Sequence, residues 1–168
     1  ASTKTVSGCQ YLYCSNAFGY DGAAIIMYHR FGESNYPSTN ISLKRFKEHI
    51  KELKKEKYTV LPLLEIISRL KEGKALPDYT VAITMDDAFL SIYTNAWPIL
   101  KRENLPFTLF VSTDYVDYNY SKYMSWEQIR ELKNAGVTIG NHSKSHAHLH
   151  KLNESEIRHE IDYSNSRF

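Results

Sequence analysis

Short apolar runs alternate with longer amphipathic segments along most of the chain. The runs are rich in β-branched and aromatic residues and stay apolar at successive positions, which is typical of strands buried on both faces. The expected strands are residues 23–28, 58–63, 80–85, 107–112 and 137–140. A parallel sheet covered by helices requires such strands, so the pattern predicts about five parallel strands.

The segments between these runs have the period of helices. In residues 42–56 the apolar positions recur at spacings of three and four and form one stripe, made of Leu43, Phe46, Ile50 and Leu53. Further helices are expected at 63–73, at 91–104 with a bend or break near Pro98, at 125–136, and from 153 through 161. Capping signals, Ser-x-x-Gln at 125–128 and Asn-x-x-Glu at 153–156, open the last two. The alternation of strand and helix predicts an α/β fold with flanking helices and an open or closed sheet.

The length of the chain limits how much of such a fold it can form. A chain of 168 residues suits one domain, whereas a closed barrel of eight strand-helix units takes about 250 residues. Residues 1–20 are expected to be an N-terminal lead segment before the first strand-helix unit. A partial barrel leaves an apolar strand edge unpaired, and a homo-oligomer that covers this edge is one solution.

Composition and charge narrow the class of partner. The 21 Lys and Arg residues are scattered among 19 Asp and Glu residues, and the net charge of +2 argues against a nucleic-acid partner. No apolar run reaches the roughly 20 residues that a membrane span needs. Cys9 and Cys14 lie close together and are equally consistent with a disulfide or with two thiols, a weak indication of the cell envelope.

Groups that can carry chemistry follow two of the predicted strands. Asp86 and Asp87 come directly after the strand at 80–85, and His142 and His146 follow the strand at 137–140. In parallel α/β folds the carboxyl ends of the strands form the functional edge. Two imidazoles and one carboxylate can hold a divalent metal ion, while the second carboxylate accepts a proton from water. The pattern therefore predicts a hydrolytic metal site.

These residues resemble a known family. "TMDDA" at 84–88 and "HSKSHAHL" at 142–149 resemble the first two motifs of the NodB-type polysaccharide deacetylases, carbohydrate esterase family 4. "IIMYHRFGE" at 25–33 is similar to exported deacetylases that act on the exopolysaccharide poly-β-1,6-N-acetylglucosamine. The resemblance implies a partial (β/α) barrel of the NodB type and a hydrolase that removes N-acetyl groups from an N-acetylhexosamine polysaccharide. It also implies a secreted, periplasmic or cell-surface location.

The resemblance also implies residue roles. Asp87, His142 and His146 would hold a divalent metal ion, most often zinc in this family, and Asp86 would be the general base. From the residues themselves, His29, Tyr118 and Tyr120 are further candidates for contact with the sugar. The tyrosines belong to a Tyr-rich segment at 114–123, which is equally consistent with rings that stack on sugars and with a loop that covers its own apolar surface. For Arg30, packing and an ion pair are favoured over a functional role.

The chain departs from the family pattern in two respects. Ala88 stands where the family has Gly, which makes a positive φ harder to adopt there. The later motifs, including the Leu-x-His segment with the general acid, do not occur before Phe168. We therefore expect residues 21–168 to be the N-terminal part of a polysaccharide deacetylase domain. Two alternatives are a non-catalytic metal- and carbohydrate-binding protein and a metal-dependent amidohydrolase of the same fold that acts on small amides.

Overall fold

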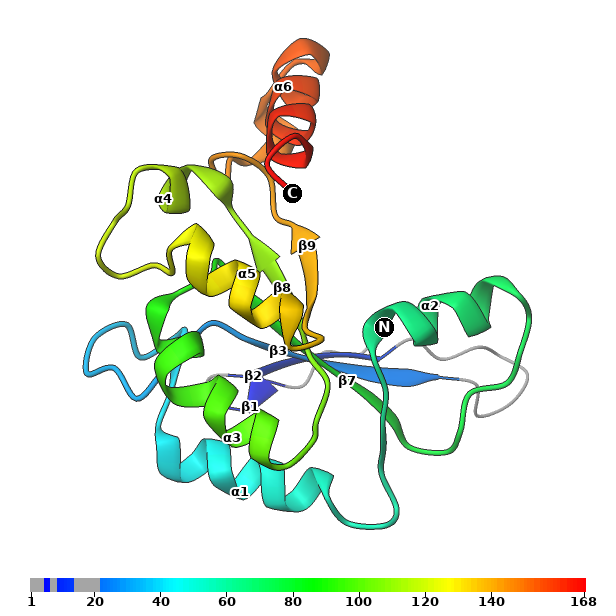
Figure 1. The fold of residues 1–168 in the computed structure, drawn as a ribbon. Coiled ribbons are helices and arrows are strands. Elements are labelled where there is room, and N and C mark those ends of the chain that lie inside the picture. Colours follow the sequence, from blue (N-terminus) through cyan, green and yellow to red (C-terminus); the bar gives the residue numbers. More distant parts are fainter. Residues whose placement is uncertain (1–4, 7–8, 14–21) are drawn as a thin grey trace.

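The computed structural model describes residues 5–6, 9–13 and 22–168, with side chains from residue 22 onward, and a twisted sheet lies at its centre (Figure 1). The strands of this sheet are β1 (Thr5–Val6), β2 (Cys9–Tyr13), β3 (Ala23–Tyr28), β6 (Thr59–Val60), β7 (Thr80–Asp86), β8 (Thr108–Val111) and β9 (Thr138–Asn141). Their order is β1-β2-β3-β7-β8-β9, with β6 paired to β7. A small separate sheet joins β4 (Arg30–Phe31) to β5 (Asn40–Ile41).

The five predicted strands are confirmed, and the pairings among these five are all parallel. β7 is the central strand and is buried along its whole length. β3 pairs with one edge of β7 in register from Ala23–Thr80 to Tyr28–Met85. The other edge of β7 is shared, because β6 pairs with its start and β8 with its end. This arrangement brings the carboxyl ends of β3, β7 and β8 together.

The lead segment contributes to the sheet, which the sequence pattern did not indicate. Its strand β2 pairs antiparallel with β3, and β1 pairs antiparallel with β2. The outer edge of β3 is therefore covered by the chain itself, while β9 at the other end pairs with β8. Cys14 lies outside the described residues and the side chain of Cys9 is not described, so the disulfide stays a prediction.

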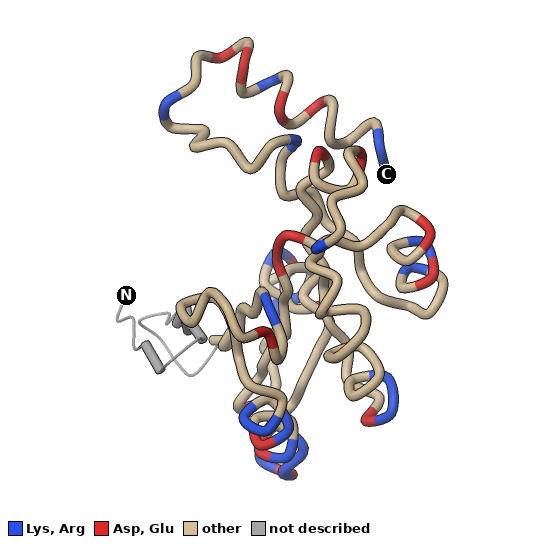
Figure 2. The backbone as a smooth tube through the Cα atoms, turned by 90° about the vertical axis from the view of Figure 1, so that its left-hand side faces the viewer, with Lys and Arg blue, Asp and Glu red and all other residues tan. Residues whose placement is uncertain are grey.

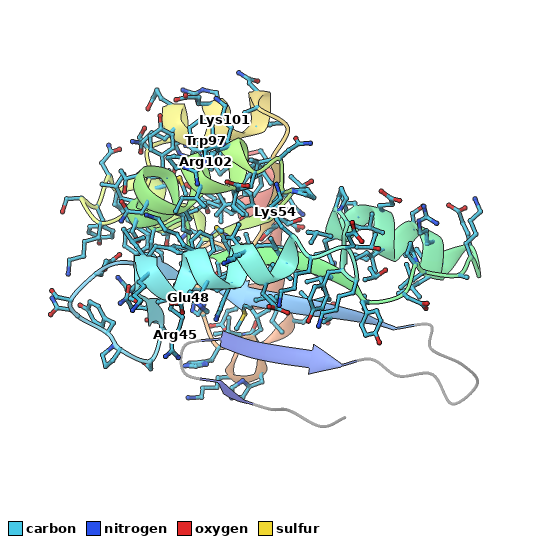
Figure 3. The ribbon with its side chains drawn as sticks, turned by 90° about the horizontal axis from the view of Figure 1, so that it is seen from below. Arg45, Glu48, Lys54, Trp97, Lys101 and Arg102 are labelled. Atoms are coloured by element: carbon cyan, nitrogen blue, oxygen red, sulfur yellow. The ribbon has the colours of Figure 1, made fainter. Side chains whose placement is uncertain are left out.

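Helices cover both faces of the sheet. The main core joins one face to the apolar stripes of α1 (Leu43–Leu53), α3 (Trp97–Arg102) and α5 (Trp126–Asn134), while α2 (Leu63–Lys71) packs on the other face through Ile66. The α1 stripe is buried as predicted. Figure 3 views the α1 and α3 layer from below, and its labelled charged residues are exposed, namely Arg45, Glu48, Lys101 and Arg102. The Lys54 ammonium bridges the ends of these helices by pairing with Glu103 at 3.1 Å.

The helix boundaries follow the capping signals. The capping boxes of α5 and of α6 (Glu154–Asn165) are both formed, as predicted. The expected break near Pro98 is also present, because the π-helix η1 (Ile92–Ala96) gives way to α3 one residue before it. The short helix α4 (Thr113–Asp117) and the 3-10 helix η2 (Leu149–Lys151) were not predicted. α4 and α6 lie beyond the carboxyl ends of β8 and β9 (Figure 1).

Charge is distributed evenly over the fold. Basic and acidic residues interleave along the helices in Figure 2, and neither sign gathers on one face in that view. Many of them form exposed pairs on one helix, such as Arg158 with Glu154. Such pairs contribute little to stability. Among the described helices, none is long and apolar enough to cross a membrane.

Candidate metal centre

The two aspartates lie where the central strand β7 ends. Asp86 is its last residue and is 7% exposed. Asp87 and Ala88 follow with φ values of 70° and 57°, in the left-handed region. Ala88 therefore adopts the conformation that the family's Gly would favour, and its carbonyl accepts a hydrogen bond from the Met124 backbone N–H at 2.9 Å. Each non-glycine residue in this region costs roughly 1–2 kcal/mol, so the surrounding contacts must hold this turn in place.

The structure brings three of the predicted site residues together. The Nε2 atoms of His142 and His146 each lie 3.5 Å from Oδ1 of Asp87. One ligand atom from each of the three lies within 4.8 Å of the others, the one such group of three found among the described residues. The two imidazole rings meet edge to face with centroids 4.8 Å apart. Each ring thus presents a nitrogen to the same carboxylate oxygen.

The donor atoms fit a divalent metal ion. Oδ1 of Asp87 is buried and has no hydrogen-bond partner among the described residues. A buried carboxylate oxygen without a partner is costly, and a cation is one group that would satisfy it. Ligands about 2.0–2.2 Å from a tetrahedral zinc ion lie about 3.4 Å from one another, close to the spacing between Asp87 and each histidine. Two imidazoles with a carboxylate also leave positions open for water or substrate.

The electrostatics of His142 favour the neutral form that ligates a metal. Burial, the largest cause, and the nearby His146 both lower the pKa of His142, whereas the Asp87 carboxylate raises it. The net result is a pKa of His142 below its ordinary value. A neutral imidazole keeps a lone pair on one nitrogen, which is the ligand form.

Asp86 faces a different partner. Its Oδ2 lies 3.9 Å from Nε2 of His29, which sits between β3 and β4 with its side chain 21% exposed. Burial is the largest cause of a pKa of Asp86 raised to about 6; His29 lowers this pKa and the charge of Asp87 raises it. The adjacent carboxylates are therefore in different environments, one beside the two histidines of the loop and the other beside His29.

The loop that carries the histidines is held to the neighbouring strand. The His142 N–H donates to the Val111 carbonyl at 3.0 Å, and the Ser112 hydroxyl donates to the His142 carbonyl at 3.0 Å. Within the loop, the His146 N–H donates to the Ser143 hydroxyl at 3.1 Å. These bonds attach the first histidine to the end of β8, beside Asp86 and Asp87.

Aromatic side chains surround the site on the side of residues 114–123. Tyr118 and Tyr120, the predicted sugar contacts, are 64% and 52% exposed. Tyr115 and Tyr123 stack with centroids 4.6 Å apart and planes 10° from parallel. Burial is the main cause of the raised pKa of Tyr123, about 12, and the charge of Asp87 adds to it. Sequence reasoning noted this Tyr-rich segment but did not single out Tyr115 and Tyr123.

Arg30 has the packing role that was favoured for it. Its guanidinium carbon lies 3.6 Å from the centroid of the Phe89 ring and 4.2 Å from that of Tyr36. The same group pairs with Glu33 at 3.3 Å. Arg30 thus joins the β4 region to the turn that follows Asp87.

Comparisons with known proteins identify the family. The family model for polysaccharide deacetylase matches residues 73–168. The chain is 28% identical over 155 residues to poly-β-1,6-N-acetyl-D-glucosamine N-deacetylase of Staphylococcus aureus strain MRSA252, covering 82% of this chain and 53% of that protein. It spans about half the length of the curated relatives it matches.

Solved structures share the fold. IcaB from Ammonifex degensii superposes with a TM-score of 0.67 at 25% identity, over 88% of this chain and 66% of that one. The deacetylase PplD of Streptococcus pyogenes, solved in complex with acetate, gives a TM-score of 0.77 at 23% identity, over 84% of this chain and 65% of that one. With the family model matching more than half of its residues, the chain belongs to the polysaccharide deacetylase family.

Proposed function

We propose that this chain carries the metal site of a metal-dependent deacetylase that removes N-acetyl groups from an N-acetylhexosamine polysaccharide. The observation that carries the proposal is the partnerless Asp87 Oδ1, with the Nε2 atoms of His142 and His146 each 3.5 Å away. Poly-β-1,6-N-acetylglucosamine is the proposed polymer, because relatives at 28% identity are named for its deacetylation. The proposed location is the cell surface, the periplasm or the outside of the cell, because the proposed polymer is an exopolysaccharide.

Asp87, His142 and His146 would hold the ion, and zinc is proposed because imidazole and carboxylate are both among its usual ligands. When bound, a divalent ion lowers the pKa of water and polarises an acyl carbonyl. Asp86 is not needed as a ligand and sits beside this centre. It is adjacent to Asp87 in the chain and faces His29, and a carboxylate beside the ion can accept the proton of the attacking water.

His29 is placed to complete the proton transfer. Hydrolysis of the amide breaks the bond between the acetyl carbon and the sugar nitrogen, and this nitrogen must gain a proton before it leaves as an amine. The His29 imidazole, with Nε2 3.9 Å from Oδ2 of Asp86, is the proposed donor. It belongs to the start of the chain, whereas sequence reasoning expected the general acid in motifs beyond residue 168.

The sugar would lie against the aromatic side of the site. Tyr118 and Tyr120 are exposed, and the stacked rings of Tyr115 and Tyr123 lie near enough to Asp87 to feel its charge. Pyranose rings present apolar C–H faces that pack on aromatic rings, while hydroxyl groups of Tyr can bond the sugar oxygens.

The experiment measures acetate release from a β-1,6-linked N-acetylglucosamine oligomer. The rate is compared before and after a chelator removes the metal, and again after zinc is added back. We expect release to depend on the metal. Asp86→Asn should lose about 100-fold or more of the rate while the protein still binds zinc, because removing a general base costs about 10²–10⁴-fold. Asp78→Asn, an exposed residue just before β7, is the matched control and should retain the rate.

A different result would favour another function. Zinc binding without acetate release from any N-acetylated sugar, in this chain and in a longer version of the protein, would support a non-catalytic metal- and carbohydrate-binding protein. Release that is unaffected by the chelator would contradict the metal-dependent mechanism.

A further inference from the structure

Glu160 is a buried carboxylate close to the metal centre that the proposed chemistry does not use. It lies in the second half of α6 and is 7% exposed. It is not among the three candidate ligands. A charged side chain is seldom buried unless it is paired or hydrogen-bonded, so its contacts indicate what it does.

Both oxygens of this carboxylate bond the loop that carries the two histidines. Oε2 accepts the backbone N–H of Ser145 and Oε1 accepts the Ser145 hydroxyl, each at 2.8 Å. The backbone carbonyl of Glu160 accepts the N–H of Lys144 at 3.1 Å. Three bonds thus join one residue of α6 to two consecutive loop residues, and the next residue is the ligand His146.

The bonds are those of an ionised carboxylate. Burial raises the pKa of Glu160, but the bonds from the Ser145 backbone and side chain, with the charge of Lys144, outweigh this and lower the pKa below its ordinary value. Hydrogen bonds to an ionised acceptor are roughly twice as strong as those between neutral groups. They offset the cost of burying the charge.

The loop needs such an anchor because its backbone is strained. Ser143 and His146 have φ values of 65° and 58°, in the left-handed region that non-glycine residues avoid. Such residues persist when the surrounding structure over-determines them. His142 is held by the bonds to Val111 and Ser112. The carbonyls of Ser143 and Lys144 accept the backbone N–H groups at the start of α4, at 3.3 and 2.9 Å, while Glu160 and the Ser143 hydroxyl hold the backbone next to His146.

Glu160 is itself held in a fixed place by the docking of α6. Asp117, at the end of α4, accepts hydrogen bonds from the Tyr163 hydroxyl at 3.1 Å, from Arg167 at 2.6 Å and from the Trp126 indole at 2.8 Å. Asn141, the last residue of β9, donates to the Ile161 carbonyl at 3.3 Å. α6 is therefore attached to α4, α5 and β9. Because Glu160 belongs to α6, the place of this helix determines where Glu160 holds the loop.

We propose that Glu160 is a positioning residue for the metal centre: by holding the backbone at Ser145 it sets the place of the His146 ligand relative to Asp87. The inference rests on the metal site of the proposed function. Outer-shell partners usually bond the ligand side chain; here the partner bonds the backbone next to it. Glu160 touches neither the ion nor the substrate.

The test measures metal affinity rather than activity alone. Zinc and cobalt(II) are titrated into the metal-free chain and into Glu160→Gln, which has nearly the same shape but no charge. We expect about 10–100-fold weaker binding, the range of outer-shell substitutions. The visible spectrum of the cobalt(II) form should also change, since it reports the ligand geometry. Glu154→Gln is the matched control, on the same helix and pointing into solvent with its side chain 80% exposed.

A second variant keeps the test valid if Glu160→Gln does not fold. Ser145→Ala removes the hydroxyl bond and leaves the backbone bond, so it should weaken metal binding by a smaller factor. The effect of combining Ser145→Ala with Glu160→Gln should be smaller than the product of the single effects, because both act through one contact. A folded Glu160→Gln variant with unchanged affinity and spectrum would falsify the inference.

The outcomes separate this inference from the proposed function. Unchanged metal binding in Glu160→Gln, with metal-dependent acetate release by the unsubstituted chain, overturns the inference alone. Metal binding that Glu160→Gln weakens, without acetate release, overturns the proposed activity and supports the inference. An unsubstituted chain that binds neither metal overturns both.

Discussion

The two halves of the candidate metal centre are built differently. Asp87 follows β7, which is buried along its whole length and has strands on both of its edges. His142 and His146 follow β9, whose four residues are all only partly buried and which pairs with β8 at one end of the described sheet. The aspartate half is fixed by the core, whereas the histidine half is a loop attached by hydrogen bonds to the end of β8, to α4 and to α6. The position of the two histidines relative to Asp87 therefore depends on how α4 and α6 are docked.

Removing the shared ligand is expected to have the largest effect. Asp87→Ala deletes the carboxylate that lies 3.5 Å from both imidazoles, so metal affinity should fall by more than about 100-fold, beyond the range of outer-shell changes. Calorimetric titration with zinc measures this. His148→Ala, an exposed histidine of the neighbouring segment, is the control and should bind zinc normally. Equal affinities in the two variants would mean that Asp87 is not a ligand.

The difference in burial between β7 and β9 is tested by an Ile→Ala substitution in each strand. Ile83→Ala in β7 should cost about 2–5 kcal/mol of the free energy of unfolding, because Ile83 is 1% exposed in the main core. Ile139→Ala in β9 should cost clearly less, since Ile139 is only partly buried. Urea unfolding of both variants measures the difference. Similar losses would show that β9 is as firmly packed as β7.

Low pH should weaken the docking of α6 on α4, because this docking depends on the Asp117 carboxylate. Burial raises the pKa of Asp117, but hydrogen bonds from Arg167, Trp126 and Tyr163 outweigh it and hold the pKa below its ordinary value. The carboxylate therefore stabilises the fold above its unfolded pKa of about 3.9, and this contribution is lost as the pH falls through the lower folded value.

Asp117→Asn tests this dependence. The variant should be about 1–3 kcal/mol less stable than the parent at pH 7, which is typical for hydrogen bonds to a charged group. The difference should shrink below about pH 4 as the parent carboxylate becomes protonated. Urea unfolding at pH 7, 5 and 3 gives the comparison, with Asp78→Asn as the control. A difference that stays constant with pH would assign the effect to packing rather than charge.

The smallest effects are expected from the two capping boxes. Ser125→Ala at α5 and Asn153→Ala at α6 each remove a cap and should each cost about 1 kcal/mol. The first helix packs on the core, so its loss should lower the stability of the whole domain. The second is docked on the histidine loop, so hydrogen exchange should show local opening of α6 and residues 142–146. If both substitutions lowered the stability of the whole domain equally, the division of the site into an aspartate half and a histidine half would be contradicted.

Much of the fold follows from local patterns. The five parallel strands, the α1 stripe, both capping boxes and the break near Pro98 were all predicted, because burial on both faces and helix period are visible in a short window. The strands β1 and β2 were not predicted. They lie in a polar segment, and the pairing of β2 with β3 and of β1 with β2 depends on a free sheet edge rather than on their own sequence.

The candidate site divides in the same way. The sequence by itself predicted the candidate residues, since Asp86, Asp87, His142 and His146 lie at or just beyond the ends of strands of a parallel sheet, where side chains meet at one edge. Only the tertiary structure decided their partners. It placed His29 beside Asp86, stacked Tyr115 on Tyr123, and buried Glu160 against Ser145. The members of these pairs are 57, 8 and 15 positions apart in the chain, and their contacts arise from packing between segments, which no local pattern encodes.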